Sequence, residues 1–169
     1  MKIEFLDKSK ADDILRELYE ILYTNMQRIA PVSGTYEEGM EFWLSCVKST
    51  LGKASRQMLL IYDNDYLAGY FQYSVNDGIF MMEDIQFRDI YKGTGIFSEL
   101  YHYLIPIIPQ DTQFVEAYAH KNNQKSQAVL AHLGLEIIGT NKNGFSWHFR
   151  GDYQNLVKRY GSQTNECLI

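Results

Sequence analysis

A short glycine-containing stretch in the middle of the chain has the composition of an anion-binding turn. It reads Lys92-Gly93-Thr94-Gly95-Ile96-Phe97 and lies between a stretch with strand character, 80–87, and one with helix character, 96–105. A turn between a strand and a helix leaves backbone N–H groups unpaired at the positive end of the helix dipole, where they can bind phosphate. A side chain at Gly93 or Gly95 would keep a phosphate off the backbone. The glycines alone also fit an ordinary tight turn. The elements around them must therefore decide whether the turn binds an anion.

Four residues near this turn have side chains that could move protons. Glu83 lies in the strand that leads into the turn, on the same face as Ile85, whereas Asp84 points to the opposite face if the strand alternates regularly. A carboxylate at Glu83 suits a general base, and it equally suits a solvated or ion-paired strand residue. Tyr118 and His120 lie near the end of the next strand and are candidate acids. With 13 tyrosines in the chain, packing is an ordinary reason for Tyr118.

Metal and disulfide chemistry are not predicted. Cys46 and Cys167 are far apart in the sequence and lack the spacing of metal ligands, so both are expected to be reduced thiols. The histidines show no metal spacing either. Reduced thiols, and an N-terminal stretch without an apolar signal-peptide core, point to the cytoplasm.

The composition of the chain narrows the class of partner. It has 169 residues, 46% of them hydrophobic, which is enough for one domain with a proper core. The net charge of −5 argues against nucleic acid as a ligand. No run reaches about 18 apolar residues, so neither a transmembrane helix nor a membrane partner is expected.

The first third of the chain predicts one strand and two helices. Residues 2–6 alternate polar and apolar side chains, as an edge strand does. Ser9, with an acidic residue three positions later, starts a first helix. Thr35 and Glu38 form a clearer capping box for a second helix, which ends near Gly52. The expected buried stripe of this second helix is Phe42, Trp43, Cys46 and Val47.

The middle of the chain predicts a three-stranded meander. Residues 58–62 and 67–75 have strand composition and are separated by a polar turn. Asp77-Gly78 is a strong hairpin signal that leads into a third strand, 79–87. This third strand feeds the glycine turn and its helix.

A further strand and helix follow. Two prolines end the helix 96–105, and residues 114–119 form the next strand. A helical crossover favours a parallel pairing between this strand and 79–87. Asn123 caps a short helix that Gly134 ends.

The end of the chain predicts an antiparallel pair and a tail. Residues 135–139 and 145–149 pair around a loop that contains Asn143-Gly144. Residues 153–169 are expected to be a tail with one or two helical turns around Leu156.

The element order and the glycine turn together resemble the GNAT superfamily of N-acetyltransferases. The resemblance covers nearly the whole chain. The turn is similar to the superfamily signature Gln/Arg-x-x-Gly-x-Gly/Ala, which binds the pyrophosphate of acetyl-CoA. Gly93 and Gly95 are kept, but Lys92 replaces the Gln or Arg, and Phe97 replaces the small last residue. Lysine supplies charge without arginine's fork, and Phe97 leaves the backbone N–H groups usable if its ring points into the core.

A second motif resembles the superfamily element Asn-x-x-Ala/Ser-x-x-x-Tyr-x-x-x-Gly-Phe. Asn123, Ser126, Gly134 and Leu135 occupy the matching positions. Leu130 stands where many members carry a tyrosine that protonates the departing thiolate, so that acid is absent here. Water could serve in its place, because a thiolate with a pKa of about 8.5 leaves without much help.

The resemblance implies an α/β fold of the α+β kind, with a mixed, mostly antiparallel twisted sheet, splayed central strands and flanking helices. It implies a single domain over residues 1–152, followed by the partly helical tail 153–169. The implied cosubstrate is acetyl-CoA, with no metal. The implied cofactor-binding residues are Ile85, Gln86, Phe87, Lys92, Gly93, Thr94, Gly95, Ile96, Phe97, Asn123 and Ser126.

The implied reaction is direct transfer of an acetyl group to a primary amine of a small molecule or peptide. A lysine-like amine, with a pKa of about 10.4, is only about 0.04% neutral at pH 7, so its deprotonation needs help. Glu83 is the predicted base and Tyr118 the predicted acid, and a backbone N–H from 85–87 would bind the thioester carbonyl. The first two helices build the acceptor site in the superfamily. The corresponding substrate-binding candidates here are Tyr23, Tyr36 and Glu37.

Two other functions stay open. A catalytically silent acyl-CoA-binding module that senses or regulates is favoured by Leu130 at the tyrosine position. A dimeric scaffold without a ligand is supported by Phe97 alone, and a homodimer is compatible with every one of these functions. Binding of CoA without thiol release would identify the module, and absence of both would identify the scaffold.

Overall fold

The structure is a computed structural model and describes residues 1–7, 11–31, 33–53 and 55–161. A seven-stranded sheet crosses the molecule in the order β1-β2-β3-β4-β5-β7-β6. Neighbouring strands are antiparallel except β4 and β5, which are parallel as predicted. The strands are β1 Lys2–Phe5, β2 Arg56–Asp63, β3 Tyr66–Asn76, β4 Ile79–Phe87, β5 Phe114–His120, β6 Glu136–Thr140 and β7 Ser146–Asp152. The helices are α1 Ala11–Met26, α2 Tyr36–Thr50, α3 Ile96–Leu104, α4 Gln124–His132 and α5 Tyr153–Tyr160.

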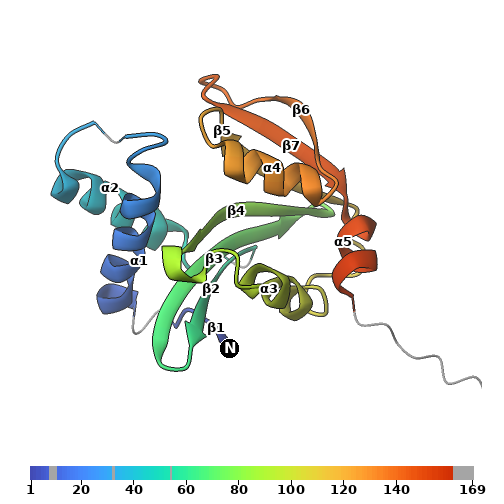
Figure 1. Cartoon of the computed structure of the whole chain (residues 1–169), viewed down its shortest axis with the longest axis horizontal. Helices are drawn as coiled ribbons and strands as arrows, with labels where there is room; N and C mark the ends of the chain where they lie inside the picture. Colours follow the sequence, from blue (N-terminus) through green and yellow to red (C-terminus); the bar gives the residue numbers. More distant parts are fainter. Residues whose placement is uncertain (8–10, 32, 54, 162–169) are drawn as a thin grey trace, which may run out of the picture.

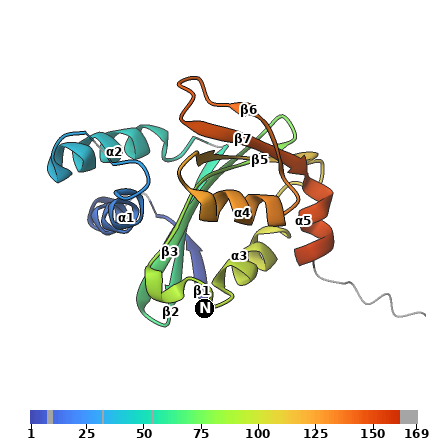
Figure 2. The same ribbon diagram turned by 45° about the horizontal axis from the view of Figure 1, so that its top comes forward.

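The helices form two layers around the sheet. Helices α1 and α2 lie on one face, and α3, α4 and α5 lie on the other (Figures 1 and 2). We call these the α1/α2 face and the α3 face. In β2, Met58 and Leu60 join the core beneath α1, while Leu59 and Ile61 join the core beneath α3. The continuous apolar run of β2 follows from burial on both faces.

Local signals in the sequence shape the element ends as predicted. Glu38 N donates to the Thr35 hydroxyl over 3.2 Å, and Thr35 N donates to the Glu38 carboxylate over 2.8 Å, which confirms the capping box. Asp77 and Gly78 have φ of 50° and 73°. Positive φ at both positions is what the tight turn of a two-residue hairpin requires, and it confirms the β3–β4 hairpin.

The buried stripe predicted for α2 is wrong at two positions. Phe42 is 73% exposed and Cys46 is also exposed. The residues of α2 that face the core are Gly39, Trp43, Leu44 and Val47. This stripe is narrow because α2 packs against α1 and the sheet on one side only.

Residues 153–160, placed by their sequence in a partly helical tail, form α5. Tyr153 and Leu156 are buried in the α3-face core, at 2% and 0% exposure. Ser9, predicted to start α1, and Cys167 lie outside the described residues. Within the described part of the chain, no helix is long and apolar enough to cross a membrane.

The parallel strands β4 and β5 separate part of the way along. Their pairing runs from Ile79 and Phe114 to Met82 and Ala117. Strand β4 then continues to Phe87 without a described partner on that side. The register between β3 and β4 also shifts, so that Gln72 pairs with Asp84 while the next β3 residue pairs with Met82. Glu83 is therefore the extra residue of a β-bulge, placed where the strands separate.

Candidate active site

A cavity of about 570 Å³ lies where β4 and β5 separate. It is lined by residues of α1, β4, the glycine turn, α3, β5, α4 and α5. Asp84 and Gln86 reach it from the α1/α2 face of β4, and Met82 and Ile85 reach it from the α3 face. The cavity therefore passes through the sheet, so ligands approaching from opposite faces could meet at β4. All of the predicted cofactor-binding residues except Thr94 line it.

The glycine turn has the geometry of an anion site at one end of this cavity. Gly93 and Gly95 have φ of 81° and 88°, in the left-handed region that favours glycine. A Cβ added to either would meet no atom within 4 Å, so both face open space. In the described part of the chain, no acceptor receives the N–H groups of Gly93, Gly95, Ile96 or Phe97. Four free donors at the N-terminus of α3 suit a phosphate group. Thr94, whose hydroxyl donates to Tyr91 O over 2.7 Å, braces the turn instead.

The charges around the turn are arranged about Asp89. Lys92 Nζ donates to Asn25 Oδ1 over 2.7 Å and forms an ion pair with Asp89. The hydrogen bond and charge of Lys92 lower the pKa of Asp89, and the charges of Lys125 and Arg28 lower it further. Two of these three cations, Lys92 and Lys125, line the cavity. The same cations could neutralise a bound phosphate.

Phe97 does not cover the turn. Its ring packs against the α3-face core, with ring centroids 6.4 Å from Phe87 and 5.0 Å from Tyr101. This is the sideways orientation that leaves the backbone donors of the first helical turn available. Its size therefore fills the core wall of the cavity and leaves the anion site open.

The β-bulge overturns the predicted alternation along β4. Glu83 was expected on the face of Ile85, with Asp84 opposite. Ile85 instead packs on the α3 face, while Glu83 and Asp84 both contact β3 residues on the α1/α2 face. A bulge places two successive side chains on one side, which a strict period of two excludes. The structure thus brings both carboxylates to the same end of the cavity.

Glu83 is fully engaged by its neighbours. Its Oε1 accepts from Arg56 Nη2 and from the Ser74 hydroxyl, each over 2.8 Å. Its Oε2 lies 2.6 Å from Arg56 Nε and accepts from Gln72 Nε2 over 2.7 Å. The carboxylate side chain is 15% exposed. Glu83 therefore lines the cavity, as Asp84 does, but both of its oxygens are engaged by neighbours and its charge is paired with Arg56.

Asp84 has neutral partners and a shifted pKa. The Tyr70 hydroxyl donates to its Oδ2 over 2.6 Å, and Gln86 Nε2 donates to its Oδ1 over 2.8 Å. Burial raises the pKa of Asp84, the charge of Glu83 adds to the rise, and the two hydrogen bonds oppose it. A half-buried carboxylate with a raised pKa and no cation beside it suits a general base.

Asn25 connects Asp84 to the anion site. Its Nδ2 donates to Gln86 Oε1 over 2.9 Å and to Phe87 O over 3.0 Å, while its Oδ1 accepts from Lys92. A continuous hydrogen-bonded chain therefore runs from Lys92 through Asn25 and Gln86 to Asp84. Asn25 lies 61 residues from Gln86, and nothing in its local sequence marks it.

Tyr118, the predicted acid, does not line the cavity. It is 46% exposed and stacks on His148 with a centroid separation of 4.4 Å. Beneath this stack Glu116 accepts from Arg150 Nε over 2.6 Å and lies 2.7 Å from His148 Nε2. Burial raises the pKa of Glu116, but the hydrogen bonds and charges of Arg150 and His148 outweigh this effect and lower it. The cluster ties β5 to β7 on the side of β5 away from Ala117, which lines the cavity.

Two of the three predicted acceptor residues, Tyr23 and Tyr36, belong to an aromatic cluster between α1 and α2. Tyr23 and Tyr36 meet edge to face at 4.8 Å, and Tyr36 also contacts Tyr19 at 5.2 Å. Neither Tyr23, Tyr36 nor the exposed Glu37 lines the cavity. The residues from this part of the chain that do so are Asn25 and Met26 at the end of α1 and Ile29 just after it.

Two further cavity residues bear on the missing acid. Leu130 is buried and lines the cavity with an alkyl side chain, which confirms that no hydroxyl stands there. Tyr101 in α3 is 1% exposed, lines the same cavity, and carries a hydroxyl. In the sequence Tyr101 belongs to the apolar stripe of α3, so its residue type was the only signal.

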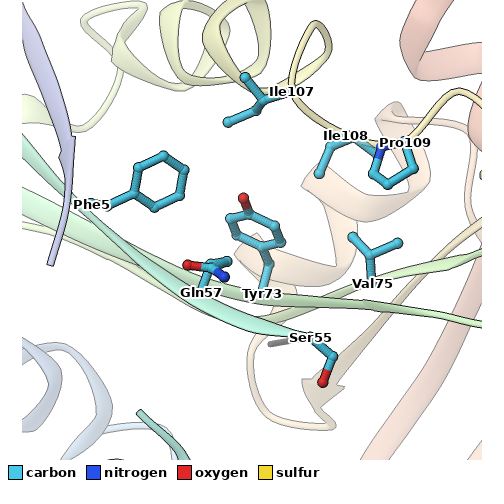
Figure 3. A pocket seen from close by; sticks show the side chains of 8 residues that line it. All are labelled: Phe5, Ser55, Gln57, Tyr73, Val75, Ile107, Ile108 and Pro109. Atoms are coloured by element: carbon cyan, nitrogen blue, oxygen red, sulfur yellow. The ribbon is translucent and has the colours of Figure 1, made fainter. Parts of the chain in front are cut away.

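A smaller hollow of about 370 Å³ lies elsewhere on the α3 face (Figure 3). The Tyr73 ring rises from the sheet between Phe5 and the segment 107–109. Burial, with a smaller effect of Tyr103, raises the pKa of Tyr73 to about 12. The lining holds no carboxylate or imidazole, so this hollow offers no base for chemistry near neutral pH.

The fold is similar to that of several solved acetyltransferases. A PaiA N-acetyltransferase from Thermoplasma acidophilum, in complex with coenzyme A, has a TM-score of 0.73 and 14% identity, covering 90% of this chain and 100% of its own. An acetyltransferase from Thermus thermophilus has a TM-score of 0.69 and 11% identity, covering 90% and 97%. A spermidine N-acetyltransferase from Vibrio cholerae has a TM-score of 0.62 and 11% identity, covering 94% and 99%.

No protein-family model and no curated sequence matches the chain. The structural likeness, which extends to an acetyltransferase named as a GNAT family member, establishes that the chain has the GNAT fold. The predicted mixed, mostly antiparallel sheet with separated central strands and flanking helices is confirmed.

Proposed function

We propose that the protein is an acetyl-CoA-dependent N-acetyltransferase that moves an acetyl group directly to a primary amine of a small molecule or peptide. One observation carries the proposal. A cavity through the gap between β4 and β5 has free backbone donors at the glycine turn and a carboxylate of raised pKa, Asp84, where the strands separate. Similar folds include one protein solved with coenzyme A and one named as a spermidine acetyltransferase, which supports this ligand and this class of acceptor.

The chain offers a complete set of contacts for acetyl-CoA, which supplies the acetyl group as a reactive thioester. The N–H groups of Gly93, Gly95, Ile96 and Phe97 would hold the pyrophosphate, with Lys92 as a point charge. The open edge of β4 beyond Met82 would run beside the pantetheine arm, and its unpaired N–H groups would bind the carbonyl oxygen.

Asp84, in place of Glu83, is the base that we propose. Both carboxylates line the cavity. The oxygens of Glu83 are held by Arg56, Ser74 and Gln72, whereas Asp84 has no cationic partner among the described residues. A proton taken by Asp84 from the amine frees the nitrogen lone pair for attack on the carbonyl carbon. Glu83 then acts on the reaction through its charge, which raises the pKa of Asp84.

The acceptor would approach from the α1/α2 face. Asp84 lies on that face, and its hydroxyl partner Tyr70 belongs to the same core as Trp43. The cluster of Tyr23 and Tyr36 borders this approach, with Glu37 exposed at the start of α2. Aromatic rings and a carboxylate at the entrance would favour a cationic amine.

A thermal-shift titration with CoA, run beside thiol release from acetyl-CoA across an amine panel, tests the proposal. We expect CoA to raise Tm saturably, because a ligand that binds the native state stabilises it by mass action. We also expect thiol release that depends on the amine. Stabilisation by CoA without thiol release would instead favour a silent acyl-CoA-binding module. The absence of both stabilisation and thiol release would contradict the binding of CoA in this cavity.

A further inference from the structure

Among the described residues, the buried hydroxyl of Tyr101 has only a sulfur atom as hydrogen-bond acceptor. Its Oη donates to Met82 Sδ over 2.9 Å, and both residues line the cavity. A thioether is a weak acceptor, so a hydroxyl that is kept from water beside it loses most of its hydrogen-bond energy. Among the described hydroxyl-bearing residues of the lining, Tyr101 alone is buried, because Tyr91, Ser126 and Tyr160 are partly exposed. The Tyr101 hydroxyl would therefore form a stronger hydrogen bond with a ligand atom that accepts better than the thioether.

The position of the hydroxyl is set by α3 and by the end of the β4–β5 pairing. Met82 pairs with Ala117 in the last register before the strands separate, so the hydroxyl lies at the inner end of the cavity. Tyr101 follows Gly95 by six residues in α3, which is about 9 Å along the helix axis. A pantetheine arm that ran from a pyrophosphate at the first turn of α3 along the open edge of β4 toward Met82 would bring its sulfur toward Tyr101.

We propose that the Tyr101 hydroxyl donates a hydrogen bond to the sulfur of CoA and stabilises the thiolate that departs from the acetyl group. This inference rests on the proposed function. It supplies a donor for the thiolate in a chain where Leu130 presents only an alkyl side chain to the cavity. Met82 Sδ would be the internal stand-in for that sulfur.

The proton and electron balance of the step is simple. The amine nitrogen bonds to the carbonyl carbon, the carbon–sulfur bond breaks, and its electron pair stays on sulfur. The ammonium proton passes to Asp84 and then to solvent, which frees the nitrogen lone pair for attack. After the nitrogen has bonded to the carbonyl carbon, it releases a second proton to solvent. Tyr101 keeps its own proton within the hydrogen bond, and the sulfur takes a proton from water as CoA leaves.

The surroundings of Tyr101 keep it a donor. Burial, with a smaller effect of Tyr160, raises the pKa of Tyr101, so the hydroxyl stays neutral throughout the working pH range. The ring is held between Phe97 and Tyr160, with centroids at 5.0 Å and 5.1 Å. Because the ring is already fixed, little conformational entropy is lost when its hydroxyl binds a ligand.

The pKa of the CoA thiol, measured while CoA is bound, tests this assignment. The probe is the ultraviolet absorbance of the thiolate in complexes of CoA with the parent protein and with Tyr101→Phe. We expect a bound-thiol ionisation constant about tenfold smaller in Tyr101→Phe, because the thiolate loses its donor. Tyr153→Phe is the matched control, since Tyr153 is also buried, its hydroxyl has no partner, and it lies outside the cavity.

Equal thiol ionisation in the parent and Tyr101→Phe complexes overturns the assignment of Tyr101 but leaves CoA binding intact. No saturable binding of CoA to the parent overturns the proposed function as well, so the two failures are distinguishable. Met82→Leu gives a second test that keeps the hydroxyl and removes its internal acceptor. The affinity for CoA should then rise about three- to tenfold relative to desulfo-CoA, which lacks the sulfur. An unchanged affinity ratio also overturns the assignment.

Discussion

The hydroxyl of Tyr70 donates a hydrogen bond to Oδ2 of Asp84 over 2.6 Å, from a ring that is wholly buried on the α1/α2 face. The bond fixes the orientation of the carboxylate and favours its charged form. Glu83, the adjacent residue of the bulge, acts in the opposite direction because its charge raises the pKa of Asp84. The two neighbours therefore set the pH range in which Asp84 can accept a proton.

Removing each neighbour should move the acidic limb of kcat/KM in opposite directions. Tyr70→Phe removes a bond that lowers the pKa of Asp84, so the limb should move to higher pH. Glu83→Gln removes a charge that raises this pKa, so the limb should move to lower pH. Rate profiles between about pH 4 and 9 measure both shifts. Tyr73→Phe, a buried tyrosine beside the other hollow, should leave the limb in place, and shifts of the same sign in the first two variants would contradict the assignment of Asp84.

Asp84→Asn should lower kcat by about 10²–10⁴-fold while CoA affinity is kept. Asparagine retains the size and one acceptor oxygen but cannot take the amine proton. The exposed Asp65 in the β2–β3 turn provides the matched control Asp65→Asn, which should retain the parent kcat. If Asp84→Asn turned over within about threefold of the parent while Glu83→Gln lost activity, Glu83 would be the base.

Gly95→Glu should abolish stabilisation by CoA. The substitution places a side chain and a negative charge where the pyrophosphate would lie. Gly144 has a φ of 76° and open space around its Cβ position, close to the geometry of Gly95, but it lies in the β6–β7 loop. Gly144→Glu therefore carries the same backbone strain without touching the turn and should bind CoA normally. If a folded Gly95→Glu protein kept the parent affinity for CoA, the pyrophosphate would bind at a site other than the glycine turn.

Lys92 and Asp89 should have opposite effects on CoA affinity. Lys92→Ala should raise Kd about fivefold, which corresponds to about 1 kcal/mol for a partly screened charge. Asp89→Asn removes the carboxylate that competes for Lys92, so Kd should fall. Isothermal titration with CoA measures both values. A weaker affinity in Asp89→Asn would indicate that the ion pair with Asp89 holds Lys92 in the position that binds the pyrophosphate.

Much of the fold could be predicted because its signals are local. The Thr35–Glu38 capping box, the Asp77-Gly78 hairpin and the glycine turn each depend on a few neighbouring residues, and each was found where expected. The buried stripe of α2 was not predicted correctly, because the exposure of Phe42 depends on how much of the helix the rest of the chain covers.

The candidate site depends on contacts that a sequence does not display. A period of two along β4 cannot reveal the bulge at Glu83, and the bulge decides which face Asp84 takes. Asn25 is defined by its contacts with distant residues, and Tyr101 by the direction of one hydroxyl within an apolar stripe. The shape of the glycine turn was predictable because backbone geometry at two glycines sufficed, whereas the candidate proton-transfer residues required the fold.

The most direct test is to incubate the protein with isotopically labelled acetyl-CoA and a panel of primary amines, and to weigh the products by mass spectrometry. We expect at least one amine to gain a single labelled acetyl group in step with the CoA released, with the yield lost in both Asp84→Asn and Gly95→Glu. CoA binding without any acetylated amine across the panel would contradict the proposed transfer, and so would a yield that both variants retain.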